Sequence, residues 1–180
     1  MNYEISFEQV SKSFGSHTVL RDVEFSITPG RVHALLGRNG AGKSTLFSIF
    51  LGLLAADSGT IRVAGAPWSR EVLDHVGASV NGPAFYGHLS AAANLRVHTR
   101  LLGLPESEIE RVLAIVGLNG AGKKKAKSFS TGMKARLALG QALLGDPEIL
   151  VLDEPQNGLD PQGIVELREL LQNLAGAGHT

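Results

Sequence analysis

The fold class is decided by one stretch, Gly37-Arg38-Asn39-Gly40-Ala41-Gly42-Lys43-Ser44-Thr45. From Gly37 to Ser44 it matches the pattern G-x-x-x-x-G-K-[ST]. The glycines allow the backbone to wrap closely, so that consecutive N–H groups point at phosphate oxygens. We expect Lys43 to reach the β and γ phosphates of a nucleotide and the Ser44 hydroxyl to bind Mg²⁺. The stretch therefore predicts a phosphate-binding loop for ATP with Mg²⁺, to which all nine residues contribute.

The segments on both sides of this loop fit its expected context. Residues 32–36 are a short apolar run, which predicts a buried strand leading into the loop. Residues 44–54 have the composition of a helix, whose positive N-terminal end would face the phosphates.

A second segment has the same glycine and lysine spacing but lacks a key group. Gly117, Gly122 and Lys123 fit the spacing, but a lysine at position 124 replaces the hydroxyl that would bind Mg²⁺. We interpret residues 123–127 as a solvated basic loop.

Two adjacent carboxylates follow another apolar run. Residues 149–152 read Ile-Leu-Val-Leu, which predicts a buried strand ending at Asp153 and Glu154. Ligands of parallel sheets bind at the C-terminal ends of the strands. Asp153 is the candidate for the Mg²⁺ shell, and Glu154 is the candidate that orients or deprotonates an attacking water.

A third segment distinguishes this chain from other phosphate-loop enzymes. Phe129-Ser130-Thr131-Gly132-Met133, just before a predicted helix, resembles the Leu-Ser-Gly-Gly-Gln signature of ATP-binding cassette (ABC) ATPases. The resemblance is greatest to the drug- and bacitracin-exporter branch. It implies that two subunits pack head to tail, and that Ser130 and Gly132 act on the nucleotide bound by the other subunit. Thr131 and Met133 depart from the family pattern.

Smaller matches to this family follow the same order along the chain. Residues 157–160, Asn-Gly-Leu-Asp, match the family's D-loop, a dimer contact. Phe14 stands where an aromatic ring stacks on adenine. Asn81 stands where the family has Gln and the exporter branch often has Glu. This departure leaves open whether Asn81 takes part in catalysis, and a role in coupling to the membrane partner remains an expectation. Phe85 and Tyr86 are candidate contacts for a membrane partner, although two aromatics equally suit a core.

Strands and helices alternate along the chain, which predicts an α/β fold with a mainly parallel sheet. The resemblance adds antiparallel N-terminal strands and a helical subdomain at about residues 82–145, within one nucleotide-binding domain covering residues 1–180. The further strands that we expect lie at residues 3–10, 18–27, 59–65 and 76–80, and the further helices at residues 90–118, 130–144 and from Asp160-Pro161 onward.

Composition limits the remaining alternatives. The chain has 17 Lys and Arg against 17 Asp and Glu, so no overall field favours nucleic acid or an anionic membrane. It has no cysteine, and its six histidines show no metal-binding spacing. We find neither a signal peptide nor an apolar run that could span a bilayer. Any membrane role must come through a partner. Because the family resemblance implies permease subunits as that partner, we expect the chain to lie in the cytoplasm against the inner face of the membrane.

The resemblance implies an ATPase subunit that drives an exporter through permease subunits. Family members continue into a further strand that ends in a switch His, so we expect the 180-residue sequence to be incomplete at its C-terminus. One alternative is therefore a nucleotide-binding fragment without useful turnover. A soluble ABC ATPase of DNA repair or translation is a weaker alternative, because the chain has neither a long coiled coil nor a second cassette. The transported substrate and the permease cannot be identified from the sequence.

Overall fold

The computed structural model describes residues 4–80, 82 and 84–180. Asn81, one of the expected site residues, lies outside the described residues. In chain order the elements are β1 (Ile5–Phe14), β2 (His17–Ile27), α1 (Lys43–Phe50), β3 (Ser58–Val63), β4 (Ala66–Pro67), η1 (Arg70–His75), β5 (Val76–Ser79), α2 (Ala91–Leu101), α3 (Ser107–Ile115), η2 (Asn119–Ala121), η3 (Ala126–Ser128), α4 (Thr131–Ala142), β6 (Ile149–Leu152) and α5 (Pro161–Gly176).

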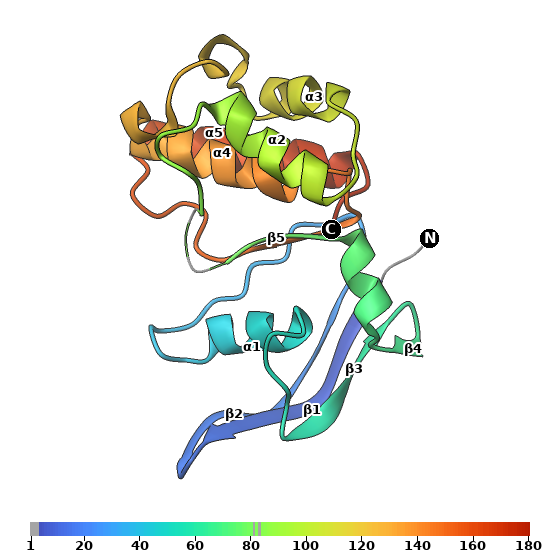
Figure 1. The fold of residues 1–180 in the computed structure, drawn as a ribbon. Coiled ribbons are helices and arrows are strands. Elements are labelled where there is room, and N and C mark those ends of the chain that lie inside the picture. Colours follow the sequence, from blue (N-terminus) through green and yellow to red (C-terminus); the bar gives the residue numbers. More distant parts are fainter. Residues whose placement is uncertain (1–3, 81, 83) are drawn as a thin grey trace.

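The molecule is layered (Figure 1). An antiparallel sheet in the order β2-β1-β3-β4 forms the lower layer, and α1 lies above it. Helices α2, α3, α4 and α5 form the upper layer, and the parallel pair β5-β6 runs between this layer and α1. The mixture of sheets and helices confirms the predicted α/β class.

The N-terminal strands confirm the expected antiparallel arrangement. Ile5 of β1 pairs with Ile27 of β2 on one side and with Val63 of β3 on the other. Ile5 and Phe7 of β1 are buried on either side of Ser6, as the period of a strand with one covered face requires, and the phase changes at the register shift between Phe7 and the buried Val10. Phe7 stacks on Phe25 with ring centroids 4.5 Å apart, and these strands share a core with α1.

The upper layer has its own core. Leu95 of α2, Val112 of α3 and Leu137 of α4 are all fully buried there. The predicted helical segment 90–118 is two helices, because the chain turns at Gly103, which has a φ of +67°. Pro105, which precedes α3, lacks the N–H that a continuous helix would use.

Charged groups fasten α3 to the end of α4. The Arg111 guanidinium donates to Glu108 at 2.7 Å and to the Leu143 carbonyl at 2.8 Å. The hydrogen bond from Arg111 lowers the pKa of the Glu108 carboxyl below its usual range. Burial lowers the pKa of His98, which lies 3.0 Å from the Gln141 amide. The packing of this layer is therefore reinforced by polar contacts.

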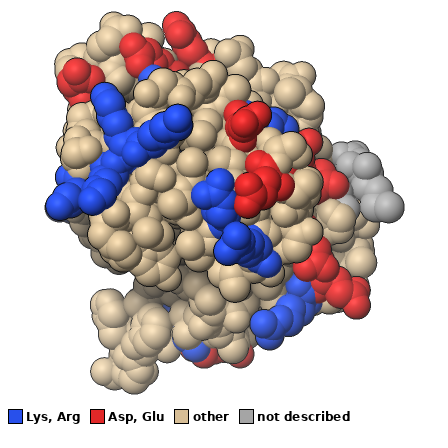
Figure 2. Space-filling view, turned by 45° about the horizontal axis from the view of Figure 1, so that its top comes forward, with Lys and Arg blue, Asp and Glu red and all other residues tan. Residues whose placement is uncertain are grey.

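The basic loop, residues 123–127, is solvated as predicted. Its four lysines are exposed, whereas Ala126 between them is fully buried. Figure 2 shows basic side chains gathered on the face of the upper layer where this loop lies.

Strands β5 and β6 are parallel, with Val76 beside Ile149 and Ser79 beside Leu152. The ladder continues one step further, because the Asp153 N–H donates to the Ser79 carbonyl at 2.9 Å. The chain then enters α5, whose N-terminus is capped by the Asp160 carboxylate accepting from the Gly163 N–H at 2.8 Å. The predicted strand ending at Asp153 and the predicted helix start are both confirmed.

The prediction of a strand at residues 32–36 is wrong. The segment has no regular structure, and among the described residues none of its main-chain groups bonds to another main-chain group. A strand satisfies its N–H and C=O groups only through a neighbouring strand, and no described strand pairs with this segment. Leu36 is accordingly 89% exposed. The parallel sheet of the described residues is thus limited to β5 and β6.

Candidate active site

The phosphate loop turns tightly before α1. The Ala41 N–H donates to the Arg38 carbonyl at 3.1 Å, and Gly40 and Gly42 have φ values of +81° and +89°. Gly42 is buried, and a Cβ added there would lie 2.6 Å from a methyl of Leu20. Glycine is therefore required at position 42 both by the backbone angle and by the close approach of β2.

Helix α1 begins at Lys43, directly after the turn. The first N–H groups of a helix have no partner within the helix, so this end of α1 offers donors and positive potential to an anion. The Lys43 ammonium folds back across the loop and donates to the carbonyls of Gly37 at 2.8 Å and Arg38 at 3.2 Å. A positive charge is thus held over the turn.

The structure brings the phosphate loop and the end of β6 together. The Ser44 hydroxyl donates to the Asp153 carboxylate at 2.7 Å, although 109 residues separate the two in sequence. Two hard oxygen ligands are therefore adjacent, as a Mg²⁺ site requires. Within the described part of the chain, no group of three or more His, Cys, Asp or Glu could hold a metal without other ligands. Mg²⁺ commonly uses one or two protein oxygens together with substrate phosphates and water, so these residues fit it.

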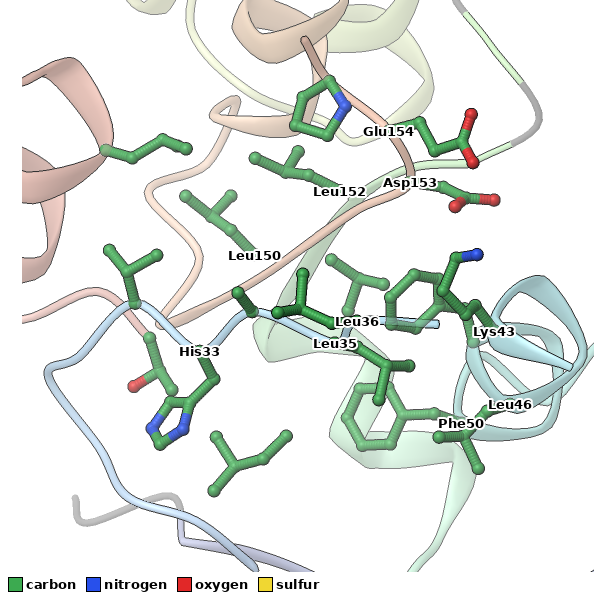
Figure 3. Close-up of a pocket in the computed structure, with 18 of the residues that line it drawn as sticks. His33, Leu35, Leu36, Lys43, Leu46, Phe50, Leu150, Leu152, Asp153 and Glu154 are labelled. Atoms are coloured by element: carbon green, nitrogen blue, oxygen red, sulfur yellow. The ribbon is translucent and has the colours of Figure 1, made fainter. Parts of the chain in front are cut away.

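Glu154 follows Asp153 in an unusual backbone conformation. Its φ is +48°, in the left-handed region that non-glycine residues seldom occupy. The Asn157 side-chain amide donates to its carboxylate, and the Asn157 N–H donates to its carbonyl at 3.0 Å. Figure 3 shows the carboxylates of Asp153 and Glu154 and the Lys43 ammonium at the same end of the pocket. Sequence reasoning placed Glu154 at a strand end and missed both the turn and the role of Asn157.

A cavity of about 570 Å³ lies beside these polar groups. Residues 31–37, α1, β6 and α5 line it, and most of its walls are apolar, including Leu35, Phe50 and Leu150 (Figure 3). Lys43, Asp153 and Glu154 lie at its edge, where charged phosphates can stay hydrated. The polar edge, and not the apolar interior, has the chemistry that an anionic ligand needs.

The signature segment, residues 129–133, lies in the upper layer. Ser130 caps α4, accepting from the Met133 N–H at 3.3 Å. A Cβ on Gly158 would lie 2.8 Å from the Thr131 methyl, so the signature segment and the D-loop pack against each other. Among the described residues no hydrogen bond joins Ser130 or Gly132 to the phosphate loop. Within one chain, the signature segment and the phosphate loop are therefore separate candidate sites.

The expected aromatic contacts lie in different surroundings. Phe14 ends β1 and is 51% exposed, with the Lys12 ammonium 5.7 Å from its ring centroid. Phe85 packs partly against the core of the upper layer, whereas Tyr86 is 53% exposed. The adenine and partner roles stay predictions.

A buried amide that sequence reasoning missed holds the segment after Phe85. Asn94 of α2 is fully buried, accepts from the Tyr86 N–H at 2.7 Å and donates to the Tyr86 carbonyl at 3.1 Å. An asparagine within an apolar helix face was the available signal, because a buried amide needs partners.

Comparison with known protein families gives one match that covers most of the chain. Residues 20–157 match the family model described as ABC transporter.

Among the described residues, no helix combines the length and the apolarity needed to cross a membrane.

Two of the curated relatives carry names from lantibiotic and bacitracin transport. The chain is 44% identical over 176 residues to a lantibiotic transport ATP-binding protein, SrtF, of Streptococcus pyogenes, covering 98% of this chain and 77% of the relative. It is 40% identical over 179 residues to a bacitracin transport ATP-binding protein, BcrA, of Bacillus licheniformis, covering 97% of this chain and 58% of the relative. The chain thus spans about three quarters of the first relative and little more than half of the second.

Solved structures agree with these relatives. The chain superposes on cbiO1 of Clostridium perfringens, part of the ABC transporter complex cbiONQ, with a TM-score of 0.88 at 29% identity, covering 98% of this chain and 75% of that one. It superposes equally well, at 25% identity, on MJ1267, an ATP-binding cassette of an ABC transporter in its ADP conformation, covering 100% of this chain and 79% of that one.

Proposed function

Because the chain belongs to the ABC transporter family as an ATP-binding subunit, we propose that it binds Mg-ATP on residues 37–45, Asp153 and Glu154 and couples hydrolysis to export. One observation carries this assignment, the 2.7 Å hydrogen bond from Ser44 to Asp153. It joins the segment suited to phosphates and the segment suited to a cation, which are far apart in sequence.

The phosphate loop supplies most of the binding. The N–H groups at the start of α1 and in the turn before it donate to phosphate oxygens. Lys43 exchanges its present carbonyl partners on Gly37 and Arg38 for oxygens of the β and γ phosphates. A charged donor bonded to a charged acceptor is stronger than one bonded to a neutral carbonyl, so this exchange is favourable.

Ser44 and Asp153 would hold the metal ion through the hydroxyl and carboxylate oxygens. A bound Mg²⁺ would supply positive charge that offsets the negative charge of the phosphates.

Glu154 positions the attacking water or accepts its proton. The Asn157 amide bonds to Oε2 of the carboxylate, so we assign Oε1 to the water. The left-handed backbone at Glu154 places this carboxylate beside Asp153 (Figure 3), an arrangement that costs strain and is common at functional sites.

Ser130 and Gly132 act on the nucleotide of a second subunit packed head to tail. Their separation from the phosphate loop of their own chain supports this arrangement, as does the exposed N-terminal end of α4 at which they lie. Phe14 stacks on the adenine, where its exposure leaves a ring face available. Asn81 and the residues near it transmit the change to a permease at the inner face of the membrane.

The relatives' names favour a lantibiotic or a bacitracin-like compound as the transported class. Nucleotide binding without turnover is the second candidate function, and the unpaired segment 32–36 favours it. If this segment shifts when ATP binds, the distance between the Lys43 ammonium and the Glu154 carboxylate will change, and hydrolysis will be slow.

The test compares two lysines that occupy similar sequence patterns. Lys43→Ala should weaken binding of a fluorescent ATP analogue at least tenfold, because a charge-assisted hydrogen bond contributes about 1.5–3 kcal/mol. Lys123→Ala in the basic loop should leave the affinity unchanged. An unaltered affinity in the Lys43 variant would overturn the assignment. Phosphate release by the unmodified chain then separates an ATPase from a subunit that only binds nucleotide.

A further inference from the structure

The exposed ring of Phe14 has a cation on one face. The Lys12 ammonium lies over this ring, 5.7 Å from its centroid, and the Lys12 side chain is only 13% exposed. A cation within about 6 Å of a ring centroid is attracted to the negative face of the ring. Phe14 is still 51% exposed, which leaves area on which a second ring can stack.

Asp57 holds this lysine in place. Its carboxylate accepts from the Lys12 ammonium at 2.6 Å and from the Ser13 N–H at 2.7 Å. The Asp57 N–H in turn donates to the Ser11 carbonyl at 2.9 Å. The hydrogen bonds from Lys12 and Ser13 lower the pKa of the Asp57 carboxyl below its usual range, so the carboxylate stays charged at neutral pH. The three residues that precede Phe14 are thus all bonded to Asp57.

The hairpin that carries Phe14 is fixed to the chain on both sides of α1. Asp57 directly precedes β3 and follows α1 along the chain. Before α1, a Cβ added to Gly42 of the phosphate loop would lie 3.1 Å from Val19 of β2. Phe14 pairs with His17, and at about 3.3 Å per residue His17 lies about 7 Å along β2 from Val19. The ring therefore has a fixed place relative to the phosphate loop.

We infer that Lys12 and Asp57 are positioning residues for the base of the nucleotide. Asp57 holds the Lys12 ammonium against one face of Phe14, and the adenine stacks on the opposite face. The inference rests on the proposed function, in which Phe14 contacts the adenine, and it adds the pair that fixes the ring. Both residues act on the base through Phe14, so they do not affect the binding of the phosphates.

The exposure of the pair favours this role over a contribution to the fold. The Asp57 side chain is 48% exposed, and ion pairs at the surface contribute little to folding stability. Their effect on a neighbouring ring is different. Each conformation of Phe14 that the pair excludes before binding lowers the entropy lost when a base stacks on the ring.

A second ion pair between the same strands supplies a matched control. Arg62 of β3 and Glu8 of β1 lie 3.2 Å apart, with side chains that are 41% and 48% exposed. Glu8 stands six residues before Phe14, about 20 Å away along β1 at 3.3 Å per residue. Loss of this pair removes similar charges from the same sheet without reaching the ring.

The first experiment titrates the chain by calorimetry with two ligands, magnesium tripolyphosphate and the magnesium complex of a non-hydrolysable ATP analogue. Lys12→Met removes the ammonium but keeps an apolar stem, so it should weaken binding of the analogue about two- to fivefold. Asp57→Asn keeps an oxygen for the Ser13 N–H but loses the charge that holds Lys12, and it should have the same effect. Neither change should alter the affinity for tripolyphosphate.

The control variants decide between a positioning role and a structural one. Glu8→Gln and Arg62→Met should change both affinities by less than about twofold. Lys12→Arg keeps a cation beside the ring and should bind the analogue as the wild type does. Equal losses of the two ligands in the Lys12→Met variant, or no loss of the analogue, would overturn the inference.

A double-mutant cycle tests whether Lys12 acts through Phe14. Phe14→Ala should weaken binding of the analogue about five- to a hundredfold, because stacking of a base on an aromatic ring is lost. Adding Lys12→Met to this variant should cause no further loss. Additive losses would show that Lys12 acts independently of the ring and would overturn the inference.

The two ligands also separate this inference from the proposed function. Lys43→Ala should weaken binding of both ligands, whereas Lys12→Met should weaken binding of the analogue alone. A wild-type chain that bound neither ligand would overturn the proposed function and this inference with it. A wild-type chain that bound both, and whose preference for the analogue did not depend on Lys12 or Asp57, would overturn only this inference.

Discussion

The upper layer and the segment leading into the phosphate loop differ sharply in packing. Leu95, Val112 and Leu137 of the upper layer are fully buried, whereas Leu36 beside the phosphate loop is 89% exposed. Residues 32–36 make no main-chain hydrogen bond to other main-chain groups of the described residues. The proposed chemistry thus lies next to the less packed segment, and we expect changes of its exposed polar side chains to affect activity more than stability.

The largest expected effect is on turnover, and it should leave the fold intact. Glu154→Gln keeps the size of the side chain but removes the base, so hydrolysis should fall by about a hundred- to ten-thousandfold. ATP should still bind, because the phosphate loop is unchanged. The steady-state rate and the nucleotide affinity would be measured on one preparation. Glu169→Gln, on an exposed position of α5, is the control, and a normal rate in the Glu154 variant would exclude it as the base.

The contrast in packing is tested by two truncations of the same residue type. Leu137→Ala should lower the free energy of unfolding by about 2–5 kcal/mol, because it leaves a cavity in the core of the upper layer. Leu36→Ala should change it by less than about 0.5 kcal/mol. Urea denaturation followed by circular dichroism measures both. A large loss at Leu36 would show that residues 32–36 pack in solution.

Two glycines of the phosphate loop sharpen the comparison within the site. Gly42→Ala places a methyl 2.6 Å from Leu20 in addition to the strain of a positive φ, so it should cost about 1–3 kcal/mol and weaken ATP binding. Gly40 has a similar φ but open space around it, so Gly40→Ala should cost about 1 kcal/mol. Equal losses of stability in the two variants would mean that Leu20 and β2 move to make room for the added methyl.

The smallest effect concerns pH and the upper layer. Arg111 lowers the pKa of Glu108 in the folded chain below its ordinary value of 4.5, so the pair stabilises the fold above that pH and loses its effect as the pH falls through the folded pKa. Glu108→Gln should therefore lower the melting temperature more at pH 7 than at about pH 4. A difference that does not depend on pH would show that the contact is steric.

Local signals in the sequence were enough to predict several elements. The strand at residues 149–152 ends at the two carboxylates as expected, since a run of β-branched and aliphatic residues needs burial. The cap of α5 by Asp160 depends on residues within one turn and was also predicted. Strand β2 was predicted from the alternation of apolar residues at positions 23, 25 and 27, and β1 was also predicted as a strand.

Features that depend on distant neighbours could not be predicted. The apolar run at residues 32–36 suits a strand, but strand formation depends on a partner that the local pattern does not reveal. The left-handed backbone at Glu154 and the bond from Asn157 arise where β6 leaves the sheet, and no local preference of glutamate indicates them. The buried Asn94 is meaningful only once the loop at Tyr86 is seen to surround it.

The bond between Ser44 and Asp153 also has a consequence for biosynthesis. A ribosome adds about 5–20 residues per second, so the 109 residues between the two partners require about 5–20 s to be made. During that time the phosphate loop has left the ribosome without its acidic partner, and the aliphatic side chains near it are available to other chains. Such contacts between distant residues slow folding, because loop closure precedes any gain. The nucleotide site is therefore among the last parts of this chain to be assembled, and nascent chains are most vulnerable to aggregation before Asp153 emerges.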